Sequence, residues 1–425
     1  MITFDPANKR IYKFLFASSI GTFLEFFDLA LYSFCAVLIA KYFFPPDADS
    51  SIAEILTWLI FAVSYVVRPF GAVWFGNIAD RHSSKRAMVL SMSMMAFATC
   101  GIGLLPTYEQ IGLLAPVLLL ILRITQSVAV SPEYNILSVF VKNNNWCAAH
   151  YGLVSSISAS ITGLGMLSAS WLMSKILGNA SLLDIPQYAW RLPFVIAGLL
   201  VGTIGIYLRW NIDDTLTADQ PKTVPIRAVL QKQFKDLLQA IIIAGYIGVI
   251  TYVLFSFLVY QLQHVRHMNP GDALAILGFG SLILPTFSLL AGYCSDYVPR
   301  NILMLAAACV IVASGFSLFS NLSIVSEHAI LIQASFMLAG LGFFAGGFPG
   351  YLAELFAHEY RYTGSFVAYN IGMSWIGGIS PLLFIGLAKI HAILPVWLIA
   401  SYSLLVIALL VQPLLSFKNV QTDIV

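Results

Sequence analysis

The chain has 425 residues, of which 59% are hydrophobic and 10% charged, with a formal net charge of +2. An average soluble domain carries about 25% charged residues, so no single soluble core could bury this much apolar surface. The apolar segments do not alternate as strands do, which predicts an all-α integral membrane protein. The balanced charge and the absence of a long basic run argue against nucleic acid as a partner.

Twelve apolar stretches follow one another, each close to the roughly 20 residues that cross a bilayer as a helix. They lie at 14–40, 52–79, 87–105, 111–141, 149–174, 190–209, 237–262, 272–295, 301–320, 328–357, 363–388 and 392–416. The first is long enough to span and is expected to stay in the product, not to be cleaved as a signal peptide. The only long hydrophilic connection predicts an N-terminal six-helix bundle at 1–210, a cytoplasmic linker at 211–236 and a C-terminal six-helix bundle at 237–425.

The lysines and arginines indicate the orientation of the chain. With both termini in the cytoplasm, the cytoplasmic ends hold most of the 22 lysines and arginines: Lys9, Arg10, Lys13, Arg81, Lys85, Arg86, Lys142, Arg209, Lys222, Arg227, Lys232, Lys235, Arg300, Arg361 and Lys418. The outer ends hold only Lys41, Lys175, Arg191, Arg266 and Lys389, and Arg68 and Arg123 fall inside spans. This positive-inside bias predicts a multi-pass protein with cytoplasmic termini. A bacterial inner membrane is its expected location.

The two halves share a loop motif. "GNIADRHSSKR" follows the second span and "GYCSDYVPR" follows the eighth, about half the chain further on. In both, glycine allows close helix approach, and an aspartate beside a basic residue predicts a charge latch at the cytoplasmic helix ends. A single copy would suit an ordinary positive-inside loop, but two copies at matching points favour a cytoplasmic gate. Its candidate residues are Gly76, Asp80, Arg81, Arg86, Gly292, Asp296 and Arg300.

Several longer segments resemble the metabolite:proton symporter branch of the major facilitator superfamily, which includes proline/betaine, alpha-ketoglutarate, citrate and shikimate porters. These are "GTFLEFFDLALYSF", "FAVSYVVRPFGAVWFGNIADR", "LLPTYEQIGLLAPVLLLILRITQSVAVSPEY", "AWRLPF" and "FPGYLAELFAHEYRYTGSFVAYNIGMSWIGGISP". The resemblance implies two pseudo-symmetric six-helix bundles that expose a midplane site alternately to each side. It also implies pocket roles for Asn370 and Trp375, and inner-gate roles for Glu354 and Arg361.

The fourth span departs from that pattern. Ser131 and Pro132 stand where the family usually has two glycines before the Glu-Tyr pair, and Lys142 stands where an acid is expected.

Five charged residues fall at membrane depth, where an isolated charge is costly. Glu25 and Asp28 lie three residues apart, on one helix face, and Glu133 lies in the fourth span with Arg123. With Arg68, the count is three carboxylates against two arginines, which leaves one acid to take up a proton. Asp28 is favoured for this role, with Glu25 held ionised by Arg68; a static salt bridge is the alternative.

One further residue is a weaker candidate for substrate binding, and several motifs of enzymes and metal sites are missing from the sequence. Tyr252, among several rings of the seventh span, could cradle a quaternary ammonium, although aromatic helix packing is the commoner role. The five cysteines lack metal-ligand spacing, and no P-loop or nucleophile–base constellation occurs. No cofactor, metal or catalytic residue is therefore expected, and the protein is not expected to be an enzyme.

The sequence predicts a proton-coupled importer of a small polar metabolite, working as a monomer in the bilayer. Arg123 and Arg68 could engage a carboxylate, while Glu25 and Asp28 could neutralise an amine or carry the proton. That combination favours a zwitterion such as an amino acid or a betaine. An organic acid (dicarboxylate, tricarboxylate or shikimate-like) is the alternative substrate, and a receptor without transport is a third possibility.

Overall fold

The computed structural model describes residues 6–45, 50–143, 147–177, 187–211, 225–268 and 282–422, and within these ranges it is helical and contains no strand. Half of the expected linker, at 212–224, and the beginning of the expected span 272–295 lie outside the described residues. Elsewhere each expected span coincides with one helix or with consecutive helices, because a long apolar stretch in lipid must satisfy its backbone hydrogen bonds internally.

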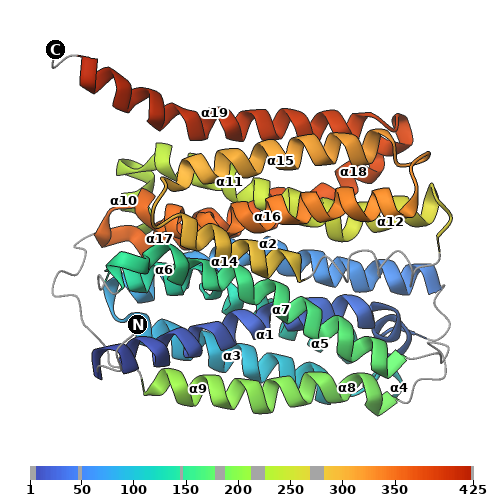
Figure 1. Cartoon of the computed structure of the whole chain (residues 1–425). Helices are drawn as coiled ribbons and strands as arrows, with labels where there is room; N and C mark the ends of the chain where they lie inside the picture. The colour runs from blue at the N-terminus through green and yellow to red at the C-terminus, as the bar shows by residue number, and fades with distance from the viewer. Residues whose placement is uncertain are drawn as a thin grey trace. The chain divides into compact units, whose positions relative to one another are not determined.

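The first half of the chain holds all the buried charged residues among those described. Its helices are labelled in Figure 1. They are α1 (Pro6–Phe43), α2 (Ser50–Arg81), α3 (Ser84–Leu104), α4 (Tyr108–Ile111), α5 (Leu114–Val130), α6 (Glu133–Asn143), η1 (Ala148–His150), α7 (Tyr151–Leu177), α8 (Gln187–Ile196), η2 (Ala197–Val201) and α9 (Gly202–Trp210). The sixth expected span is thus α8, η2 and α9 together, with η2 a wide π-helical turn.

The second half of the chain includes two further π-helical turns, η3 and η5. Its elements are α10 (Pro225–Lys232), α11 (Phe234–Tyr252), η3 (Val253–Leu258), α12 (Val259–His264), α14 (Ile283–Cys294), α15 (Arg300–Ser320), α16 (Glu327–Leu355), η4 (His358–Tyr360), α17 (Arg361–Asn370), η5 (Ile371–Gly377), α18 (Gly378–Ile390) and α19 (Leu394–Thr422).

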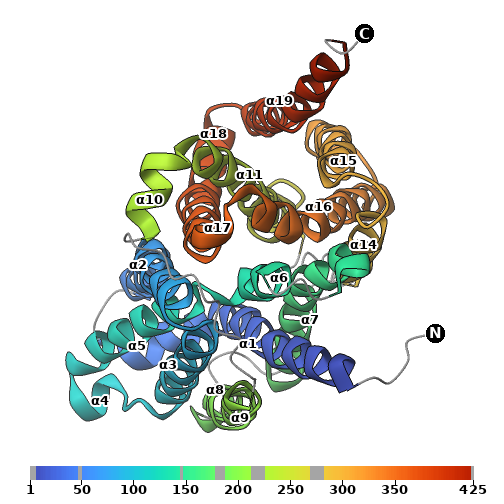
Figure 2. The ribbon, with the colours of Figure 1, turned by 90° about the vertical axis from the view of Figure 1, so that its left-hand side faces the viewer.

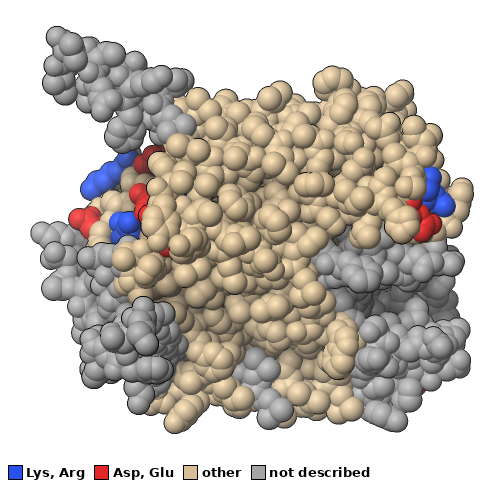
Figure 3. All heavy atoms as spheres, in the orientation of Figure 1, with Lys and Arg blue, Asp and Glu red and all other residues tan. Residues whose placement is uncertain are grey.

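The helices have the length and composition of membrane spans. Among the described residues, 10 helical segments are long and apolar enough to cross a bilayer, and Ile283–Cys294 is a shorter apolar helix. On the face drawn in Figure 3, the visible Lys, Arg, Asp and Glu side chains gather at the two helix ends, and other residue types cover the middle. The expectation of a helical, multi-pass membrane protein is confirmed.

The chain forms two compact units. Unit 1 comprises Met1–Phe140, Ile161–Ala228 and Glu359–Val367, and unit 2 comprises Val141–Ser160, Val229–His358 and Ala368–Val425. Within unit 1, α9 packs against α1 and α3; within unit 2, α15 contacts both α16 and α19 (Figure 2). Each unit therefore includes a short segment from the other half of the sequence.

The fourth expected span is broken between α5 and α6, at Ser131 and Pro132. Proline has no backbone N–H, so Pro132 cannot donate to the carbonyl of Val128. The Ser131 hydroxyl donates to that carbonyl instead, at 2.6 Å. Gly71 of α2 lies against the same turn, where an added Cβ would come within 2.6 Å of the Val128 carbonyl oxygen. The serine that departs from the family pattern thus satisfies the backbone at the break.

Candidate functional site

Asp28 and Arg123 form a buried ion pair inside unit 1. Arg123 Nη1 donates to Asp28 Oδ2 at 2.9 Å, and the two side chains are 5% and 7% exposed. Gln126 accepts from Arg123 Nη1 at 2.7 Å and donates from Nε2 to Asp28 Oδ1 at 2.8 Å. Thr99 also donates to Asp28 Oδ1, at 3.4 Å, and the Arg123 guanidinium lies 3.9 Å from the centroid of the Tyr32 ring. Both oxygens of Asp28 are therefore hydrogen-bonded.

Glu25 and Arg68 form a second, looser pair. Arg68 Nη1 lies 3.4 Å from Glu25 Oε1, and the carboxylate side chain is 2% exposed. Glu25 Oε2 is buried and accepts no hydrogen bond from the residues that the structure describes. The Arg68 guanidinium lies 4.7 Å from the centroid of the Tyr65 ring on the same helix, a cation–π contact. The expected pairing of Glu25 with Arg68 is present, with a single weak contact to the carboxylate.

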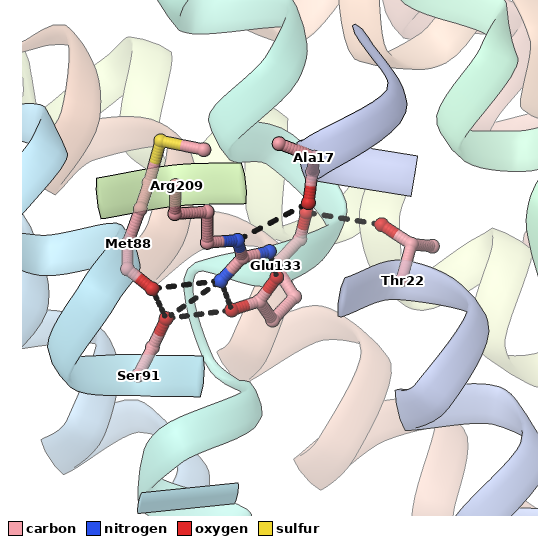
Figure 4. A network of polar contacts seen from close by, with 6 residues as sticks. All are labelled: Ala17, Thr22, Met88, Ser91, Glu133 and Arg209. Atoms are coloured by element: carbon pink, nitrogen blue, oxygen red, sulfur yellow. Dashed lines mark hydrogen bonds and ion pairs between the residues drawn. The ribbon is translucent and has the colours of Figure 1, made fainter. Parts of the chain in front are cut away.

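Glu133 pairs with an arginine that sequence reasoning had assigned to the cytoplasmic surface. Arg209 Nη1 donates to Glu133 Oε1 at 2.8 Å and Nη2 to Oε2 at 2.5 Å (Figure 4). Arg209 also donates to the carbonyls of Met88 at 2.7 Å and Ala17 at 3.2 Å, and the Ser91 hydroxyl donates to Glu133 Oε1 at 2.6 Å. This network ties α6 and α9 to α1 and α3.

The predicted imbalance of three carboxylates against two arginines is therefore wrong. Arg209 is fully buried, and it is the third arginine of the cluster. Its position at the end of the sixth span resembles a cytoplasmic flank, because the positive-inside rule uses position along the chain and not the direction of the side chain. Each acid has an arginine partner, so the charge count alone does not identify a proton carrier.

Two polar residues that contact Asp28, Gln126 and Thr99, were not predicted as site residues from the sequence. Gln126 follows Arg123 by three residues and so shares its helix face, which is a usable sequence signal. Thr99 lies on α3 and also accepts from Gln126 Nε2, at 2.8 Å. A single threonine in an apolar span carries no such signal.

The loop aspartates of the two halves make equivalent contacts. Asp80 accepts from the backbone N–H of Tyr362 at 3.1 Å and of Thr363 at 2.8 Å, at the start of α17 within unit 1. Asp296 accepts from the backbone N–H of Gly152 at 2.5 Å and of Leu153 at 3.2 Å, at the start of α7 within unit 2. A carboxylate is stabilised at a helix N-terminus, where backbone N–H groups lack partners.

These contacts change the expected chemistry of the latches. The sequence predicted aspartates held by neighbouring Arg or Lys side chains, whereas their hydrogen-bond partners here are the N-termini of α17 and α7. Arg81 follows Asp80 at the end of α2, and the Arg86 backbone N–H donates to the Ser83 hydroxyl, which caps α3. Arg361, the first residue of α17, acts on Asp80 electrostatically.

The two motif glycines allow this close packing. An added Cβ at Gly76 would lie 2.7 Å from the Cα of Thr363, and one at Gly292 would lie 2.8 Å from the carbonyl oxygen of Gly152. Both distances are too short for a side chain. Gly76 therefore lies where α2 contacts α17, the helix that Asp80 caps. Gly292 lies where α14 contacts α7, the helix that Asp296 caps.

Glu354 joins a separate charge cluster in unit 2. Arg300 Nη1 donates to Glu354 Oε1 at 2.7 Å and to Oε2 at 2.6 Å, and Lys142 Nζ donates to Oε1 at 2.9 Å. The Arg300 and Lys142 cations each lie 4.9 Å from the centroid of the Tyr151 ring. Glu354 was expected near Arg361, but the ion pairs that the structure gives it are to Arg300 and Lys142. Lys142 replaces an expected acid, and it still takes part in an ion pair.

The candidate pocket residues of the second half lie on α11 and on the consecutive elements α17 and η5. Tyr252 ends α11, Asn370 is buried at the end of α17, and Trp375 is 39% exposed in η5. α11 and η5 approach closely, since an added Cβ at Gly248 of α11 would lie 2.9 Å from the Cα of Gly377 in η5. π-Helical turns of this kind often occur at functional sites. No group of three or more His, Cys, Asp or Glu suited to a metal occurs among the residues described.

The chain is similar to several known membrane transporters. A proline/betaine transporter of Escherichia coli (strain K12) is 28% identical over 405 residues, covering 88% of this chain and 77% of the relative. A Staphylococcus aureus (strain COL) relative is 27% identical over 391 residues, covering 88% and 82%. The solved structure of the proton:xylose symporter XylE bound to 6-bromo-6-deoxy-D-glucose is 14% identical, with a TM-score of 0.77 and coverage of 94% and 95%. The sequence profile of the Major Facilitator Superfamily matches residues 18–381, and the chain belongs to that family.

Proposed function

We propose that this protein imports a small zwitterionic metabolite, an amino acid or a betaine, together with protons by alternating access. The family and the named relatives are transporters, and the relative from Escherichia coli has the name proline/betaine transporter. In a secondary transporter of this fold, the energy comes from an ion gradient and the binding site lies near the bilayer midplane. The small-molecule substrate and the proton are then the two transported species.

The observation that carries the proposal is the cluster of buried acid–arginine pairs inside unit 1. Ionisable residues in membrane spans are costly, and they mark substrate paths or proton relays. Arginine can bind a carboxylate with two parallel hydrogen bonds, and a carboxylate can neutralise a substrate amine. A zwitterion satisfies both kinds of group. Arg68 and Arg123 are the proposed carboxylate ligands, with Tyr252, Asn370 and Trp375 as proposed pocket residues of the second half.

The chain's wider arrangement follows from the same proposal. Residues 1–210 and 237–425 are the two bundles, joined by a cytoplasmic linker at 211–236, with both termini in the cytoplasm of a bacterial cell and the protein in its inner membrane. Asp80, Asp296 and the Glu354 cluster form the cytoplasmic gate. The monomer is the functional unit, because each chain contains both bundles.

A proton symporter of an organic acid is the second candidate. The two arginines Arg68 and Arg123 favour it, since a dicarboxylate or tricarboxylate could engage both. The two proposals differ in what they require of the substrate, because only a zwitterion carries a cationic group for Glu25 or Asp28 to neutralise.

Uptake into proteoliposomes tests the proposal. Purified protein in vesicles with an inward proton gradient is expected to accumulate labelled proline or glycine betaine, and a protonophore should abolish accumulation. Succinate, citrate and shikimate form the comparison panel. Accumulation of an organic acid alone favours the second candidate, and binding of any of these compounds without uptake indicates a receptor.

A further inference from the structure

We infer that Glu25 and Arg68 form the exchangeable pair of this carrier: Glu25 takes up the transported proton, and Arg68 then receives the substrate's carboxylate. Asp28 and Arg123 form a fixed pair that positions α1 against α5. The inference rests on the proposed function and assigns its coupling step to one of two neighbouring acid–arginine pairs. Of the two arginines proposed as carboxylate ligands, it keeps Arg68 as the ligand and gives Arg123 a structural role.

The hydrogen bonds of Asp28 leave no place for a proton. Arg123 donates to Oδ2, and Gln126 and Thr99 donate to Oδ1. A hydrogen on either oxygen would face a donor. Turning the Gln126 amide by 180° would give Asp28 an acceptor, but it would place the amide NH₂ against Arg123 Nη1, which now donates to Gln126 Oε1 at 2.7 Å. The Thr99 hydroxyl could accept from a protonated Oδ1 only at 3.4 Å, the long limit of a hydrogen bond, so the network as a whole favours an ionised Asp28.

Glu25 has the opposite geometry. Its only described polar contact is the 3.4 Å approach of Arg68 Nη1 to Oε1, at the long limit for an N–H···O hydrogen bond. Oε2 is buried, and no donor among the described residues points to it. A proton can bind Oε2 without meeting a donor and without disturbing any other hydrogen bond. An ionised carboxylate with one bare buried oxygen is costly, and protonation lowers that cost, because a buried neutral hydroxyl is less unfavourable than a buried charge.

The charges then balance through one exchange. Protonation of Glu25 removes its negative charge and leaves the Arg68 guanidinium without its counterion in a low-dielectric site. The carboxylate of an incoming zwitterion supplies a negative charge at Arg68 and can do so through two hydrogen bonds. When Glu25 loses its proton on the other side of the membrane, it pairs with Arg68 again and displaces the substrate. Proton and carboxylate therefore bind together and leave together.

The surroundings of Glu25 contain several other groups that bear on its charge. Arg68 lies on α2 with Tyr65 against its guanidinium, and Glu133 and Tyr134, both on α6, interact electrostatically with Glu25. Glu133 is neutralised by Arg209, and Asp28 by Arg123. Two acids of the cluster thus have tight arginine partners, and Glu25 has the weak one.

Matched neutral substitutions test the assignment in proteoliposomes with proline as the probe. In Glu25→Gln, the amide NH₂ can occupy the Oε2 position without facing a donor, so this variant mimics the protonated carrier. It should still exchange external for internal proline, yet accumulate no more proline than empty vesicles under an imposed proton gradient. Asp28→Asn should impair both exchange and accumulation, because its amide must face a donor. Gradient-driven accumulation by Glu25→Gln would overturn the inference.

A second measurement does not depend on the substrate. Infrared difference spectra of the purified protein, recorded across a pH titration, report the carboxylic C=O stretch of a buried acid as it is protonated. We expect this band in the wild type and in Glu133→Gln, and its loss in Glu25→Gln. A band that persists in Glu25→Gln and disappears in Asp28→Asn would move the proton to Asp28. If wild-type vesicles transport no compound of the panel while the band behaves as expected, the proposed function fails and the assignment of the proton stands.

Discussion

Arg209 donates to both carboxylate oxygens of Glu133, and the two side chains are 0% and 1% exposed. The pair joins the last helix of the sixth span to the helix that follows the break in the fourth. Because Arg209 also binds the carbonyls of Met88 and Ala17, it fixes α9 against α1 and α3 (Figure 4). Its contacts are those of a structural clamp, not of a transport site.

Removing one member of this clamp should destabilise the protein strongly. Arg209→Gln leaves a buried, uncompensated carboxylate, which typically costs about 3–5 kcal/mol. We expect a large fall in the melting temperature in detergent, measured by thermal unfolding. Arg227→Gln, on the exposed face of α10, is the control and should leave the melting temperature unchanged. The double variant Glu133→Gln/Arg209→Gln should recover part of the loss, and equal losses in single and double variants would argue against a paired clamp.

Ser131 should be needed for the broken fourth span. Ser131→Ala removes the hydroxyl that donates to the Val128 carbonyl at 2.6 Å and leaves that carbonyl the longer hydrogen bond from the backbone N–H of residue 131, at 3.4 Å; a lost hydrogen bond typically costs about 0.5–1.5 kcal/mol. The free energy of unfolding should fall by that amount. Ser168→Ala is the matched control, because the exposed Ser168 hydroxyl bonds only the Leu164 carbonyl of its own helix. Comparable effects of the two substitutions would contradict the role given to Ser131.

Asp80 should control the rate of transport more than the affinity. Asp80→Asn removes the charge that caps the N-terminus of α17, a contact of about 0.5–2 kcal/mol, and should lower the initial uptake rate several-fold. Binding of proline to purified protein, and expression, should stay close to wild type. Asp296→Asn is expected to have a smaller effect in the same direction. Wild-type uptake by Asp80→Asn would remove the latch from the mechanism.

The two cations on Glu354 should differ in importance. Arg300 makes two hydrogen bonds to the carboxylate and its side chain is 14% exposed, whereas Lys142 makes one and is 35% exposed. An exposed ion pair typically contributes about 0–1 kcal/mol, so Lys142→Ala should reduce uptake only slightly. Arg300→Ala should reduce it more, because it breaks the less exposed and doubly bonded pair. Initial uptake rates at matched expression test the order, which is wrong if Lys142→Ala has the larger effect.

The two arginines should respond differently to loss of their planar, two-pronged head groups. In Arg68→Lys, the point charge of lysine replaces the proposed carboxylate ligand, and the preference for proline over prolinamide should be reduced. Arg123→Lys should retain that preference, although its network with Asp28 and Gln126 is disturbed and its stability should fall. Competition binding with both ligands on both variants is the measurement. Loss of discrimination in Arg123→Lys alone would return the carboxylate site to Arg123.

The sequence determined which segments form helices. Long apolar stretches have only one way to satisfy their backbone in lipid, so composition and length were sufficient to predict them. The same is true of the duplicated glycine and aspartate motifs, because Asp80 and Asp296 occupy equivalent positions in the two halves. Glu25 and Asp28 could also be identified from the sequence, because a charged residue inside an apolar stretch is rare and can be recognised without knowing the fold.

Only the tertiary structure decided how these charges pair. A helical span fixes the depth of a residue, but the rotation of each helix about its axis and the choice of neighbours depend on packing across the whole unit. Arg209 therefore looked like a surface cation in the sequence, although in three dimensions it is buried against Glu133. The sequence favours Asp28 as the proton carrier, but it does not reveal the hydrogen bonds that Gln126 and Thr99 donate to the Asp28 carboxylate. Partners from α3, α5 and α9 are distant along the chain, and only folding brings them to one place.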